Sequence, residues 1–326
     1  ASVVILLVIL IGGIFWMRTA GTARRQIAEQ QAKLNHVRDL LSEASTAGQF
    51  DKAKAADLLS AGEQETLAVL NSNVLRNDAV KMMDEIQKQR DGLDEIQRVS
   101  APIVLADLTT KRPNVNALGL MNLKDRLFAF EYNALYEMVL DKLQEPLTID
   151  SLETVILGAP YDDKGSLLFL TRTGKMIEYI STKFLTVTTK DGIWKKGVDM
   201  KSYNSRVYVL DPERNQIWRY TRRNDGFDGG EAYNQDADLK KAVGLAIDSS
   251  VYVLNSDGTV IQMYQGQKQE YPLRRAPLVP ISAPTKIFTS GDLNYIYILE
   301  PSKARVVIFR KDPKNGGAQY QTQYVF

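Results

Sequence analysis

Apolar and polar residues follow three successive patterns along the chain. Residues 2–17 form one uncharged apolar run, which ends with Phe15 and Trp16 and is followed at once by Arg18. A helix needs about 17 to 25 apolar residues to span a bilayer, and aromatic residues gather where such a span meets the interface. We therefore expect residues 1–18 to form a single transmembrane helix. A signal-peptide core and a buried helix are the alternatives.

Residues 19–100 carry a helical pattern, in which apolar positions recur at heptad spacing between charged and glutamine residues. The first stripe consists of Ile27, Leu34, Val37, Leu41 and Ala44. Gly48 interrupts it, and Asp51 is a suitable N-cap for a following helix. We expect a helical hairpin or coiled-coil stalk, which acts as a simple spacer or drives self-association. His36 is expected on its charged surface.

Residues 101–326 contain five short apolar strands at nearly even spacing. They begin at residues 127, 167, 207, 251 and 296, which are 40, 40, 44 and 45 positions apart. A polar turn and a second strand follow each one, and another strand precedes it. Small residues in that preceding strand, Gly119, Gly197 and Gly244, suit a crowded position near an axis.

Units of several strands at a period of about 40 to 45 residues have the dimensions of a propeller blade. The fold class that we predict is therefore a transmembrane helix and an α-helical stalk followed by an all-β propeller. Five blades are visible, and a sixth blade in a longer protein is an open alternative. A β-sandwich is the structural rival.

Composition narrows the chemistry. The chain has 41 Lys and Arg against 39 Asp and Glu, and this balance argues against a dedicated nucleic-acid binder. It has no cysteine, which excludes disulfides, thiolate metal sites and cysteine nucleophiles. Its one histidine lies in the stalk, so no Ser-His-Asp set is available to the propeller. We expect no enzymatic activity, no cofactor and no metal in this chain.

One stretch of the propeller mixes aromatic and cationic side chains. It contains Trp218, Arg219, Tyr220, Arg222 and Arg223. Such a mixture can stack on bases or saccharides, or anchor a protein partner. Alternation along a strand, however, puts Trp218 and Tyr220 on one face, where core packing is the alternative. The acidic, Gly-rich residues 224–231 do not match the EF-hand spacing, so we interpret them as an inter-strand loop rather than a calcium site.

The repeats resemble NHL-type propellers. The stretch that carries the resemblance runs through Val207-Tyr208-Val209-Leu210-Asp211 to Asn215-Gln216-Ile217-Trp218. The whole layout is similar to uncharacterised bacterial membrane proteins with an anchor, a helical stalk and a C-terminal propeller. Some of these carry a PPM-type serine/threonine phosphatase domain upstream, of which this chain shows no motif. The resemblance implies architecture and not chemistry.

The function that we expect is a membrane-tethered interaction scaffold, which binds a protein, a peptide or an envelope polymer through the loops at one end. The main alternative is a sensor or regulatory domain of a larger membrane signalling enzyme, such as a PPM-type phosphatase. A propeller enzyme is a third possibility, for which the first strands offer only scattered carboxylates such as Asp199 and Asp248.

The expected location is a membrane, with the lipid bilayer contacting residues 1–18. Ala1 stands inside the apolar run, which predicts a fragment of a longer protein. We expect an extracytoplasmic propeller, although Arg18, Arg24 and Arg25 favour a cytoplasmic C-terminal side.

Overall fold

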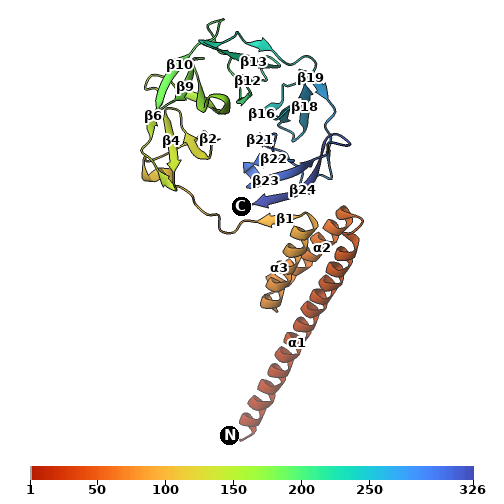
Figure 1. Ribbon diagram of the computed structural model, residues 1–326. Helices are drawn as coiled ribbons and strands as arrows, with labels where there is room; N and C mark the ends of the chain where they lie inside the picture. The colour runs from red at the N-terminus through yellow and green to blue at the C-terminus, as the bar shows by residue number, and fades with distance from the viewer. Residues whose placement is uncertain (1) are drawn as a thin grey trace. The chain divides into compact units, whose positions relative to one another are not determined.

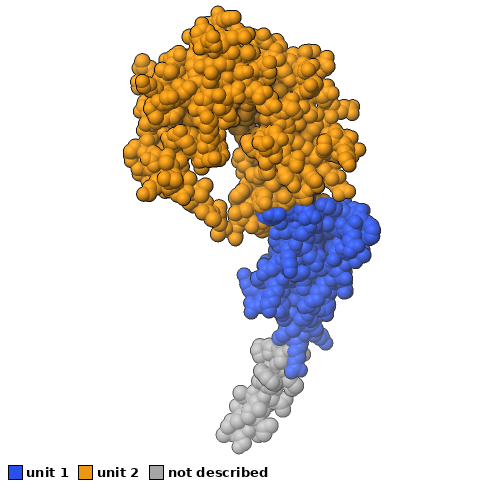
Figure 2. Space-filling view, in the orientation of Figure 1, with its two compact units in different colours: residues 1–97 blue, residues 98–326 orange. Residues whose placement is uncertain are grey.

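The chain divides into two compact units, residues 1–97 and residues 98–326 (Figure 2). Their structure is a computed structural model, which describes the backbone of residues 2–326 and the side chains of residues 21–326. The first unit is helical and the second consists of β-sheets (Figure 1).

Three helices form the first unit: α1 (Ser2–Ala47), α2 (Lys52–Asn71) and α3 (Arg76–Leu93). The predicted stripe on α1 supplies the core, because Leu34, Val37, Leu41 and Ala44 are all buried. Ile27 does not join it and is 47% exposed, because α1 extends past the segment against which α2 and α3 pack (Figure 1). The predicted N-cap is confirmed: an Asp51 carboxylate oxygen accepts a hydrogen bond from the Lys54 amide at 3.0 Å.

The predicted membrane span falls on residues 1–18, whose side chains lie outside the described residues. In the part of the chain that is described, no helix combines the length and the apolar character that crossing a bilayer requires. The span and the orientation of the protein therefore stay predictions.

The second unit is a propeller of five blades, each a mainly antiparallel sheet (Figure 1). Blade 1 contains β2 (Gly119–Leu123), β3 (Arg126–Phe130), β4 (Ala134–Val139), β5 (Lys142–Leu143) and β6 (Leu147–Thr148). Blade 2 contains β7 (Val155–Tyr161), β8 (Ser166–Thr171), β9 (Met176–Ile180) and β10 (Lys183–Val187). Blade 3 contains β11 (Asp199–Tyr203), β12 (Arg206–Asp211), β13 (Gln216–Arg223), β14 (Gly226–Phe227) and β15 (Glu231–Ala232).

Blade 4 contains β16 (Ala242–Ile247), β17 (Val251–Asn255), β18 (Val260–Tyr264) and β19 (Gln267–Gln269). Blade 5 contains β21 (Lys286–Phe288), β22 (Tyr295–Glu300), β23 (Arg305–Lys311) and β24 (Ala318–Val325), with β20 (Leu273–Arg274) parallel to β24. A short strand, β1 (Ile96–Arg98), precedes them all. The five strands predicted from the sequence are the second strands of the blades: β3, β8, β12, β17 and β22.

Neighbouring blades pack face to face, because their strands are apolar on both sides. On β12, Val207 and Val209 contact blade 2, whereas Tyr208 and Leu210 contact blade 4. Similar buried clusters lie between blades 1 and 2 and between blades 4 and 5. The apolar runs that define the repeat therefore form the four interfaces between neighbouring blades.

Crowding at the small residues is confirmed, but its source differs from the prediction. A Cβ on Gly197 would lie 2.2 Å from the Leu210 carbonyl oxygen, so this glycine, which precedes β11, is needed within its own blade. A Cβ on Gly244 would lie 3.3 Å from the Ile287 amide of the next blade. Only Gly244 is crowded by the first strand of a neighbouring blade, which is the kind of crowding that we predicted near the axis.

Candidate functional site

The five residues singled out by the sequence all lie on β13, the third strand of blade 3. Trp218, Tyr220 and Arg222 lie on the face that packs against blade 2, and Arg219 lies on the opposite face, over the Tyr233 ring. The prediction that Trp218 and Tyr220 share one face is confirmed. Because side chains alternate along β13, the five residues do not form one continuous surface.

Tyr220 belongs to the core. It is fully buried, and its ring centroid lies 4.4 Å from that of Trp194. The hydroxyl accepts a hydrogen bond from the Lys195 amide at 2.8 Å. Burial raises the pKa of Tyr220 to about 12, so the hydroxyl stays protonated. This side chain packs the interface between blades 2 and 3 and is not accessible to a ligand.

Trp218 is half-buried and is already engaged on two sides. Its indole Nε1 donates to an Asp211 carboxylate oxygen at 2.9 Å, and the Lys195 ammonium lies 5.7 Å from the ring centroid. On the other face of the strand, Arg219 donates to Glu231 at 2.7 Å. These contacts stabilise the turn and the edge of blade 3, so neither side chain is free to stack on a ligand.

Arg222 and Arg223 line a surface groove of about 740 Å³ between blades 2 and 3. The other residues of this groove are Tyr161, Asp163, Lys164, Lys190, Ser205, Asn224 and Asp225. Four cations and two carboxylates line it, so positive side chains are in excess.

Arg222 occupies the floor of the groove. Its guanidinium donates to a Glu178 carboxylate oxygen at 2.9 Å and lies 4.9 Å from the Phe227 ring centroid. The Arg222 Nε and the Tyr161 hydroxyl are buried without a hydrogen-bond partner among the described residues. The structure thus brings two of the five predicted residues together in a polar groove.

The acidic segment at residues 224–231 is only partly the predicted loop, because Gly226–Phe227 form β14, which pairs with β13. The Asp228 carboxylate pairs with Lys190 at 3.0 Å and with the Arg223 guanidinium. The hydrogen bond from Arg223 and then that from Lys190 lower the pKa of Asp228 to about 2. Its charge is therefore balanced by protein cations.

A second cavity, of about 610 Å³, opens on the propeller axis and was not predicted from the sequence. All five blades contribute to it at the C-terminal ends of their first strands. Its polar residues are Asn122, Lys124, Asp125, Asp162, Asp163, Lys201, Ser202, Asn204, Thr289 and Ser290. The even repeat could have indicated where such a cavity lies, but not which turns reach it.

Asp199 lies at the opposite, N-terminal end of these first strands. Its carboxylate accepts from Lys201 at 3.0 Å, from the Leu245 amide at 2.9 Å and from Lys286 at 3.4 Å. Burial alone would raise the pKa of Asp199, but the two ammonium groups and the amide outweigh it and hold the pKa below its usual value. Asp199, which the sequence offered only as an isolated carboxylate, therefore joins blades 3, 4 and 5 through two ion pairs and one hydrogen bond.

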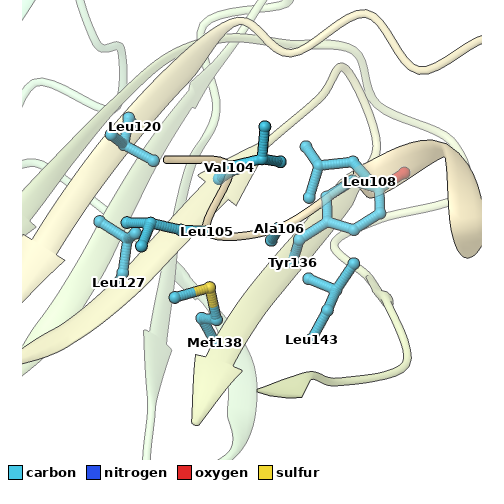
Figure 3. Close-up of a pocket in the computed structure, with 10 residues that line it drawn as sticks. Val104, Leu105, Ala106, Leu108, Leu120, Leu127, Tyr136, Met138 and Leu143 are labelled. Atoms are coloured by element: carbon cyan, nitrogen blue, oxygen red, sulfur yellow. The ribbon is translucent and has the colours of Figure 1, made fainter. Parts of the chain in front are cut away.

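An apolar pocket of about 330 Å³ lies on blade 1 (Figure 3). Side chains from residues 104–108 form one wall, and the sheet forms the other with Leu120, Leu127, Ala129, Tyr136, Met138 and Leu143. The Tyr136 hydroxyl donates to Glu131 at 2.7 Å, so it is not free to bind a ligand. In the described part of the chain, no group of three or more His, Cys, Asp or Glu side chains is placed to hold a metal ion.

No protein-family model and no curated protein matches the chain. Among solved structures, it is similar to PorZ, a surface component of the type-IX secretion system of Porphyromonas gingivalis, with 12% identity and a TM-score of 0.44. That match covers 63% of this chain and only 26% of PorZ.

Two further structures show similar likenesses. The nidogen/laminin complex matches with 15% identity and a TM-score of 0.45, over 65% of this chain and 85% of the other. YCF48 bound to D1 peptide matches with 12% identity and a TM-score of 0.41, over 63% and 66%. At this level they carry no argument about function, and the NHL subtype and the phosphatase association stay predictions.

Proposed function

We propose that this chain is a non-enzymatic, membrane-tethered propeller scaffold, which binds a polar segment of a protein or peptide partner in the axial cavity. The observation that carries the proposal is the cavity of about 610 Å³, which all five blades line and to which blades 1, 2, 3 and 5 contribute polar side chains. Sites supported by several rigid strands hold their geometry better than sites on a single loop.

The lining of the cavity favours a polypeptide ligand. Lys124 and Lys201 offer donors, Asp125 and Asp163 offer acceptors, and Leu120 and Phe288 add apolar surface at one side. A segment that carries both charges and an occasional apolar side chain would satisfy all three kinds of group. The tether in this proposal is the apolar run of residues 2–17.

Site-specific photo-crosslinking in native membranes tests the binding site. A crosslinking amino acid at Asn122, which is exposed in the cavity, should capture one partner. The same group at exposed Lys240, which precedes the first strand of blade 4 and so lies at the other end of the propeller, should not. The substitution Lys201→Glu should abolish the capture at Asn122. Equal capture at both positions, or capture that ignores Lys201→Glu, would contradict the proposal.

Membrane fractionation tests the tether. The native chain should stay with the membrane during alkaline carbonate washing, and a chain that lacks residues 1–18 should be released. Release of both forms would remove the membrane from the proposal and leave the cavity to be judged by crosslinking alone.

A further inference from the structure

The ring of blades is open at one place. The first strands contact each other in the order β2, β7, β11, β16, β21, and a buried apolar cluster lies behind each of these four contacts. Across the described residues, β21 and β2 form no comparable contact, and no buried cluster joins blades 5 and 1. Figure 2 shows an opening through the second unit, and Figure 1 places it between these two blades.

Blade 1 turns an apolar face to the opening. Met121 and Leu123 of β2 pack against blade 2, so the alternate residues, Leu118 and Leu120, lie on the other face. These two are 41% and 68% exposed. Leu127 and Met138 are paired across β3 and β4 on the same face. Residues 104–108 cover part of this face as the other wall of the apolar pocket. In a propeller, a preceding blade covers the rest of such a face.

Blade 5 also turns an apolar face to the opening. Ile287 and Ile298 pack against blade 4, which leaves Phe288 and Tyr297 paired on the other face with ring centroids 6.2 Å apart. Phe288 is 56% exposed. The opening is thus bordered on both sides by the kind of surface that fills the other four interfaces.

One segment without a β-strand already crosses the opening. We call residues 99–117 the strap; it begins where the Val99 amide donates to the Val325 carbonyl at 2.8 Å and leads to blade 1 (Figure 1). Its residues Ile103, Val104 and Leu105 are 88%, 76% and 62% exposed. Among the described residues, no backbone hydrogen bond pairs residues 101–106, so this apolar segment has the free backbone groups of an edge strand.

We propose that the opening is the seat of a sixth sheet, a β-meander donated by another polypeptide. Its outermost strand pairs with residues 102–106 of the strap, and its two faces pack on blades 1 and 5. The occupant must be a polypeptide in β conformation, because only a strand satisfies the free backbone of the strap. It must be apolar on both faces, because it continues the series of four apolar interfaces. The opening shares Leu120 and Phe288 with the axial cavity, but the strap does not line that cavity. Hydrogen exchange of the strap and crosslinking at Asn122 therefore test the two proposals separately.

A peptide that copies residues 242–264 is a suitable probe. These residues form β16 to β18, and in this molecule their sheet packs against blade 3 through Leu245 and Val253 and against blade 5 through Tyr252 and Leu254. A matched control peptide carries Val253→Lys and Leu254→Lys, which makes both faces charged.

Hydrogen exchange of the whole chain, with and without the peptide, tests the seat. Without the peptide, the amides of residues 103–106 should exchange freely. With it, their exchange should slow by on the order of tenfold or more, and the control peptide should have no effect. Leu120→Glu in the protein should abolish the protection, whereas Leu185→Glu, at a leucine 50% exposed on blade 2, should leave it intact.

Four results would overturn the proposal. Absence of protection with the copied peptide, or protection that survives Leu120→Glu, would show that the opening is not a seat for a sheet. Slow exchange of the strap before any peptide is added would show that its own polypeptide already occupies the opening. Protection that rises with protein concentration alone would assign the surface to a second copy of this chain.

Discussion

The Asp199 carboxylate lies 3.4 Å from the Lys286 ammonium, and this ion pair joins the first strands of blades 3 and 5. Lys201 on the same strand as Asp199 completes the pair at 3.0 Å. Asp199 is 3% exposed, while the side chains of Lys201 and Lys286 are 28% and 47% exposed. One nearly buried acid therefore holds two cations that still reach solvent.

Asp199→Asn should destabilise the propeller by about 1 to 3 kcal/mol, because the buried link to both lysines and the Leu245 amide is weakened. The expected loss of stability is smaller than for a fully buried ion pair, because solvent screens the two lysines. Urea unfolding measures the difference, and Glu270→Gln, at an exposed acid, is the control. Equal stability of the two variants would mean that Asp199 links nothing.

The same carboxylate predicts a pH dependence. Its pKa is lower in the folded than in the unfolded protein, so its stabilising contribution is complete above the unfolded pKa of about 3.9 and falls as acid protonates the folded form. The stability gap between the parent protein and Asp199→Asn should therefore narrow as the pH falls below about 4. Unfolding curves at several pH values test this, and a gap that widens in acid would contradict the lowered pKa.

Gly197→Ala should destabilise the propeller by roughly 1 to 3 kcal/mol, because its Cβ would lie 2.2 Å from a backbone oxygen that cannot move away freely. Gly291→Ala is the matched control, since a Cβ there meets nothing within 4 Å. Thermal unfolding of both variants compares them. A melting temperature unchanged by Gly197→Ala would show that the strand start relaxes without cost.

Tyr220→Phe should destabilise by about 1 to 3 kcal/mol, because the Lys195 amide loses the hydroxyl that accepts its hydrogen bond. Tyr264→Phe, at a tyrosine 54% exposed, should be nearly neutral. Denaturant unfolding followed by tryptophan fluorescence suits this pair, because Trp194 stacks on Tyr220. Similar losses in both variants would mean that the hydroxyl contributes nothing specific.

His36 should titrate above its usual range. Its Nδ1 lies 2.9 Å from a Glu65 carboxylate oxygen, and this hydrogen bond, followed by the charge of Glu65, raises the pKa of the imidazole. NMR titration of this one histidine should show a lower pKa in Glu65→Gln than in the parent chain. Arg38→Gln, at a neighbouring position without a contact to Glu65, is the control. An unshifted titration in Glu65→Gln would remove Glu65 as the cause.

The repeat could be predicted because each blade carries its apolar strands in local sequence. Val207 to Leu210 form a continuous apolar run, which predicted a strand, and the structure explains the run by burial of both faces of that strand. The Asp51 N-cap could likewise be predicted, because capping depends on residues within one helical turn. Short-range rules therefore predicted most elements correctly.

The ion pairs of Asp199 and the opening could not be predicted in this way. Asp199 and Lys286 are separated by 87 positions, and nothing near either residue indicates the other. Leu120 and Phe288 have the composition of core residues, and only the arrangement of the blades leaves them exposed. Trp218 and Tyr220 show the opposite case, since a composition typical of binding sites serves mainly to pack blade 3.

The hydrogen bond between Val99 and Val325 has a mechanical consequence. It joins positions near the two ends of residues 98–326 directly. Tension applied between those ends would first strain this bond at the margin of blade 5. The other four blades would stay outside the path of the force until that margin separates.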